Sequence, residues 1–167
     1  MQNSDINQLK EVKKIIEKHF KFESHLIEPS EINSLSTLIC ILPKGPVRLE
    51  RNLNLTFLPL NDKDIKEIKL LQFFSILPGQ TFKNADDKLK DVLLYISQRT
   101  ALGNFSIHNS NEIAIRYVYP FSKNNEIDSS NFAETLSLFL LTLDLFSIKL
   151  RNFANGLVSA ADILKNV

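Results

Sequence analysis

The sequence has one cysteine, four glycines and no tryptophan among 167 residues. A single cysteine excludes an intramolecular disulfide and a zinc site made of several thiolates. Cys40 lies within the apolar run 38–42, so we interpret it as a buried, unreactive thiol. The three histidines are scattered without metal-ligand spacing, so we expect no bound metal.

The few glycines and the absent motifs argue against catalysis. The glycines do not cluster, and the chain contains neither GxxxxGK[ST] nor GxGxxG nor HExxH. No nucleophile lies beside a suitable base in a recognised local pattern. We therefore expect a protein that is not an enzyme and that binds no cofactor.

Charge of either sign is not in excess, because 20 Lys and Arg residues balance 19 Asp and Glu residues, for a net charge of +1. Nucleic-acid binding needs a basic patch, so we expect no nucleic-acid partner. Long apolar runs are also missing, since Asp144 and Lys149 interrupt the most apolar segment, Leu136–Leu150. The N-terminal residues do not have the pattern of a signal peptide. The sequence thus predicts a cytoplasmic protein with no membrane partner.

The apolar periodicity predicts an α+β fold in a single domain. The length suits one domain over 1–167, with a core at 5–155 and a C-terminal tail at 156–167. Apolar residues at three- and four-residue steps predict helices, and alternating or continuous apolar runs predict strands. The expected helices are 5–20, 86–102 and about 131–153, and the expected strands are 35–43, 47–58, 68–77, 104–109 and 112–121. The connector 21–34 has no clear apolar period, and at most a short strand is expected near Leu26. The second helix has an inward apolar stripe and ends at Gly103; the stripe consists of Leu89, Val92, Leu93 and Ile96. The tail is expected to add at most one short helical turn. The order is α-β-β-β-α-β-β-α, with an antiparallel sheet of about five strands.

Arg51 is the unusual polar residue, because the alternation places it on the apolar face of its strand with Leu53 and Leu55. Two interpretations are open. Arg51 pairs with a carboxylate near the sheet edge, or it lies under an anionic ligand in a pocket with the tyrosines of strand 113–121. The ion pair is favoured because charged groups near cores are usually paired.

The middle of the chain resembles the YbjN-like family, described as bacterial sensory transduction regulators with the type III secretion chaperone-like fold. The resemblance is carried by the sequence LGNFSI at 102–107, at the end of the second predicted helix, and by EIAIRY at 112–117 in the next strand. The order of elements over about 5–155 is also similar. The resemblance implies a non-catalytic cytoplasmic protein that binds another polypeptide, often as a homodimer.

The predicted elements carry more apolar surface than one sheet and three helices need. The last helix is apolar on most sides, which predicts that most sides are covered. Candidate partner-binding residues are those that lie outside the expected internal contacts. They are Leu71, Phe73, Leu77, Leu94, Tyr95 and Leu102. Alternatively, the connector 21–34 and the tail cover these residues within the monomer.

The sequence therefore favours a non-catalytic protein-binding module, chaperone-like or regulatory, that holds a segment of a partner polypeptide or pairs with itself. The alternative is a small-molecule-sensing regulatory domain with its pocket near Arg51 and strand 113–121.

Overall fold

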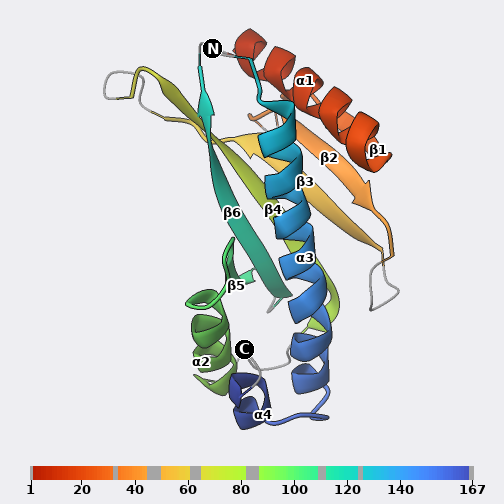
Figure 1. The fold of residues 1–167 in the computed structure, drawn as a ribbon, viewed down its shortest axis with the longest axis vertical. Coiled ribbons are helices and arrows are strands. Elements are labelled where there is room, and N and C mark those ends of the chain that lie inside the picture. The colour runs from red at the N-terminus through yellow and green to blue at the C-terminus, as the bar shows by residue number, and fades with distance from the viewer. Residues whose placement is uncertain are drawn as a thin grey trace.

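A computed structural model describes residues 2–31, 34–44, 50–60, 65–81, 87–108, 112–123 and 126–165. Runs of strands are separated by helices along the chain, which is an α+β arrangement (Figure 1). The elements are α1 (Gln2–Phe20), β1 (Glu23–Ile27), β2 (Thr37–Leu42), β3 (Arg51–Phe57), β4 (Ile68–Thr81), α2 (Asp87–Ser97), β5 (Asn104–His108), β6 (Glu112–Ser122), α3 (Ser129–Ala154) and α4 (Ala160–Lys165).

The strands form one six-stranded antiparallel sheet in the order β1-β2-β3-β4-β6-β5. The predicted α+β class is confirmed, and the prediction of about five strands is wrong by one. The added strand is β1, which lies in the connector 21–34 and pairs with β2. Only Ser24 and Leu26 of β1 point toward the helices, so this short edge strand shows almost no apolar period. The chaperone-like fold stays a prediction.

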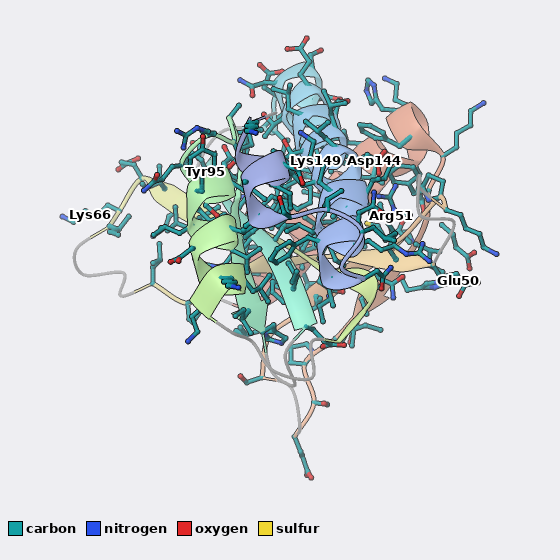
Figure 2. The ribbon with its side chains drawn as sticks, turned by 90° about the horizontal axis from the view of Figure 1, so that it is seen from below. Glu50, Arg51, Lys66, Tyr95, Asp144 and Lys149 are labelled. Carbon is teal, nitrogen blue, oxygen red and sulfur yellow. The ribbon has the colours of Figure 1, made fainter. Side chains whose placement is uncertain are left out.

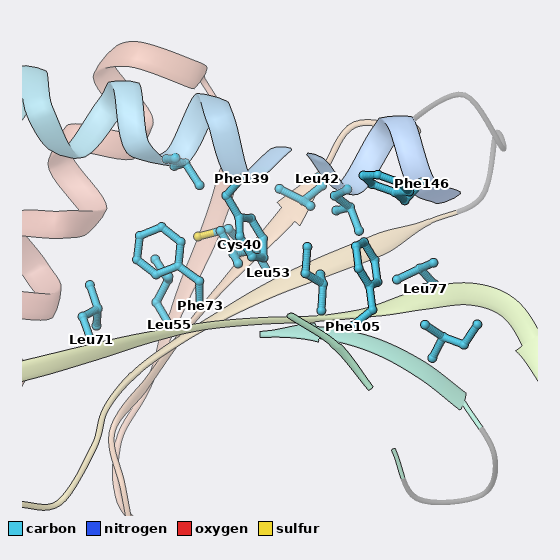
Figure 3. Close-up of a cluster of buried hydrophobic side chains, with 14 of the residues drawn as sticks. Cys40, Leu42, Leu53, Leu55, Leu71, Phe73, Leu77, Phe105, Phe139 and Phe146 are labelled. Carbon is cyan, nitrogen blue, oxygen red and sulfur yellow. The ribbon is translucent and has the colours of Figure 1, made fainter. Parts of the chain in front are cut away.

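Helices α1 and α3 lie over one face of the sheet, and the core is the layer between them and the strands (Figures 1 and 3). The alternation within β3 explains this arrangement, since Leu53, Leu55 and Phe57 are buried while Asn52 is exposed. Every second residue of β4 from Leu71 to Leu77 points into the same layer. The largest fully buried side chains include Phe73, Phe132, Phe139, Leu9, Ile16, Leu38, Leu53, Leu55, Leu71 and Leu77.

The two faces of β4 are buried to different extents. Leu71 and Phe73 are fully buried under the helices, whereas Leu70, Phe74 and Ile76 on the opposite face are half-buried. Neighbouring side chains supply part of that second cover, such as the ring of His108 beside Phe74 at 5.1 Å between centroids.

The C-terminal tail adds to the core. Residues 156–167 were expected to contribute at most a helical turn, and they contain α4, whose Ile163 is buried. Helix α4 contacts both α2 and α3 at one end of the molecule (Figure 1). It therefore helps to fix α2 beside the edge strand β5.

Candidate functional site

Three of the six predicted partner-binding residues lie inside the protein. Leu71, Phe73 and Leu77 are fully buried by the chain itself. The rings of Phe132 and Phe139 from α3 lie 5.7 and 5.6 Å from the ring of Phe73. Helix α3 therefore covers Phe73, and all three side chains are buried and form no exposed surface.

The other three lie at the surface or near it, on α2 and the turn that follows. The Leu94 side chain is 60% exposed. Tyr95 is half-buried, and the Arg99 guanidinium lies 3.4 Å from the centroid of its ring. Leu102 is half-buried between α2 and β5 in the chain. Among the six predicted partner-binding residues, Leu94 is therefore the one that is strongly exposed.

Leu94 borders an apolar groove between α2 and β5, with a volume of about 470 Å³. Leu93 and Phe105 line it and are themselves buried, while Ile107 is half-buried. On a helix, Leu93 and Leu94 point about 100° apart, so one fills the core and the other stands beside the groove. The full lining is Lys90, Leu93, Leu94, Ser97, Asn104, Phe105, Ser106 and Ile107.

The Ser97 side chain connects the two walls of the groove. Its hydroxyl accepts a hydrogen bond from the Phe105 amide at 2.8 Å and donates to the Phe105 carbonyl at 3.3 Å. Strand β5 is an edge strand, and edge strands commonly accept a further strand through such backbone groups. Because Ser97 occupies both groups of Phe105, strand addition is disfavoured here, and insertion of side chains into the groove is favoured.

The sequence did not reveal the rest of the groove. Leu93 was expected only in the inward stripe of its helix, and Phe105 only in a strand. The groove exists because α2 packs beside β5, and no local pattern encodes that contact. The single available signal was Leu94, an apolar residue outside the inward stripe.

Arg51 forms an ion pair with Asp144 of α3 (Figure 2). Its side chain is almost fully buried, and its Nε donates to the Pro43 carbonyl at 3.2 Å. Of the two interpretations from the sequence, the structure contains the ion pair. This contact ties the middle of α3 to β3.

The proposed sensing pocket is divided in the structure. The cavity beside Arg51 has a volume of about 230 Å³ and is otherwise lined by Glu50, Asn52, Asn54 and Ile76. Tyr119 borders a different cavity of about 170 Å³, together with Glu126 and Asp128. Tyr117 and Tyr119 also contact the ring of Phe73. Among the described cavities, none therefore joins Arg51 to the tyrosines.

Neither a metal cluster nor a membrane-spanning helix is found in the described ranges. Within them, no group of three or more His, Cys, Asp and Glu side chains is arranged to hold a metal ion. Across the same residues, every helix is too short or too polar to cross a membrane.

The chain was also compared with known proteins. No family model matches it, and no curated protein matches it. The YbjN-like resemblance therefore stays a prediction, and the functional argument depends on the geometry of the groove.

Proposed function

We propose that the chain is a non-catalytic protein-binding module, chaperone-like or regulatory, whose α2–β5 groove holds an apolar segment of a partner polypeptide. The observation that carries this proposal is Leu94, which is 60% exposed at the rim of an apolar groove. Apolar side chains that gather at an exposed concave surface are typical of interaction sites.

The form of the groove favours one mode of binding. Ser97 already bonds both backbone groups of Phe105, so the partner segment contributes apolar side chains rather than an added strand. An amphipathic helix or a turn presents such side chains on one face.

Substitution of Leu94 should change the affinity of the groove for its partner. Burying an exposed leucine side chain stabilises a complex by about 1.5–3 kcal/mol when burial is complete. A glutamate at this position removes that gain and places a charge against Leu93 and Phe105. We therefore expect Leu94→Glu to weaken binding at least about tenfold.

Selection of peptides from a random display library tests the proposal. Peptides with clustered apolar residues should be enriched on the wild-type chain, and they should bind Leu94→Glu at least about tenfold more weakly. Leu157→Glu is the matched control, because Leu157 is 71% exposed and lies outside the groove. The proposal is wrong if no peptide is enriched, or if the enriched peptides bind Leu94→Glu as well as Leu157→Glu.

A further inference from the structure

Helix α3 carries a second apolar face that points away from the core. Leu138, Leu141, Leu145 and Ile148 are 49%, 63%, 52% and 43% exposed, and we name these four residues the α3 stripe. The opposite side of the helix is buried against the sheet, through Leu136, Phe139, Leu143, Phe146 and Leu150. One helix thus has one apolar face inside the protein and another in contact with solvent.

The spacing of the α3 stripe indicates what covers it. Its members follow one another by three, four and three residues, which is the repeat of a coiled-coil seam. In heptad terms, Leu138 and Leu145 occupy a positions, and Leu141 and Ile148 occupy d positions. Such a seam interlocks with another helix that has the same repeat, and a second copy of this chain supplies one.

The charges beside the α3 stripe indicate the orientation of the two helices. Asp144 precedes Leu145 at a g position, and Lys149 follows Ile148 at an e position. In a parallel pair, each g residue faces the e residue five positions further along the other helix. Asp144 therefore faces Lys149 of the second copy, and the symmetry repeats this contact. An antiparallel pair centred on the stripe would bring the two Asp144 carboxylates together.

Asp144 is also held in place for this contact. Its ion pair with Arg51 of β3 fixes the carboxylate on one flank of α3, while its side chain stays 37% exposed. The Lys149 ammonium lies 5.5 Å from the ring centroid of Phe146, and the e position of Lys149 places it on the flank of the α3 stripe opposite to Asp144.

We propose that two copies of this chain associate through their α3 stripes as a parallel pair of helices, with Asp144 of each copy beside Lys149 of the other. A seam of four layers should bury less area than the roughly 800 Å² per partner of a standard stable interface. We therefore expect a dimer that forms at micromolar concentration. The dimer does not depend on the proposed function, because the groove lies on α2 and β5.

Sedimentation velocity across a concentration series tests the association. The wild-type chain should dimerise, and Leu141→Glu/Leu145→Glu should weaken the dimer at least about tenfold with an unchanged circular dichroism spectrum. Leu94→Glu is the matched control, since it disrupts the groove and should leave the dimer intact. The proposal is overturned by a wild-type chain that stays monomeric, or by a double variant that dimerises like the wild type.

Single cysteine variants test the orientation. Under mild oxidation, Leu141→Cys should form a disulfide-linked dimer, because residue 141 faces residue 141 in a parallel pair. The native Cys40 is fully buried and does not compete. An antiparallel pair would instead link Leu141→Cys to Leu145→Cys in a mixture, and it would leave Leu141→Cys alone unlinked. That result would overturn the parallel arrangement.

Discussion

Among the described residues, the buried charge of Arg51 forms its ion pair with a residue of another element. Asp144 neutralises it across the α3–β3 contact. Asp144→Ala removes the carboxylate from this buried ion pair, and the loss of one partner from such a pair costs about 3–5 kcal/mol. Because water contacts the Asp144 side chain, we expect about 3 kcal/mol. Urea unfolding measures this loss of stability.

The charge itself, rather than lost packing, should explain that loss. The double variant Arg51→Met/Asp144→Ala removes both charges, so it should recover much of the stability. Glu134→Ala, at an exposed position on the same helix, is the matched control. An Asp144→Ala protein as stable as this control would show that Asp144 does not compensate Arg51.

Cys40 should be unreactive in the folded protein. Burial, with a smaller contribution from the nearby Glu17 carboxylate, raises the pKa of the thiol to about 12. The thiolate is the reactive form, so we expect almost no labelling by a disulfide reagent at about pH 8, and one labelled thiol per chain in urea. Stoichiometric labelling of the folded chain within minutes would contradict the burial of Cys40.

The same pKa shift predicts how stability varies with pH. The unfolded thiol ionises near its ordinary pKa of 9.0, whereas the folded chain keeps this proton up to about 12. The folded state therefore binds more protons over this interval, and the contribution of Cys40 to the free energy of unfolding falls as the pH rises through it.

At the scale of elements, Gly103 directs the chain from α2 into β5. The sequence predicted a helix as far as residue 102 with Gly103 at its end, but α2 ends at Ser97 and a turn follows. Gly103 has a φ of +84°, and a Cβ there would lie 3.1 Å from Ile115 Cγ1. Gly103→Ala should therefore cost about 1–2 kcal/mol in thermal or urea unfolding, because the left-handed backbone is strained for alanine.

Gly156→Ala separates the two causes of that cost. Gly156 also has a positive φ, +68°, but no atom lies within 4 Å of the added Cβ. It therefore reports the backbone strain alone, and Gly103→Ala should be the more destabilising of the two. Equal losses would mean that Ile115 moves away without cost.

The elements with a long buried face were the ones that the sequence could predict. The alternation of β3 and the apolar repeats of α1 and α3 arise because each of these elements buries one face in the core. Strand β1 was expected only as a short strand near Leu26 within the connector, because five residues at a sheet edge bury only two side chains in part or in full. The pairing order of the strands is set by contacts that are distant in sequence, so no local pattern contains it.

At the scale of the whole molecule, the apolar side chains that the sequence left without a cover fall into two groups. Leu71, Phe73 and Leu77 are enclosed by the chain itself, which the sequence could not decide because it does not show where α3 lies. Leu94 and the α3 stripe are exposed to solvent. For the candidate groove, the sequence identified Leu94 but not the wall formed by β5.

The central claim is that the α2–β5 groove binds a partner segment, and an NMR titration tests it most directly. A peptide selected on the wild-type chain is added to the isotope-labelled protein, and the amide shifts are followed residue by residue. We predict that the shifts concentrate at Lys90, Leu93, Ser97, Phe105 and Ile107, and that Leu94→Glu needs at least about tenfold more peptide to produce them. Shifts confined to another surface, or unchanged in Leu94→Glu, would contradict the claim.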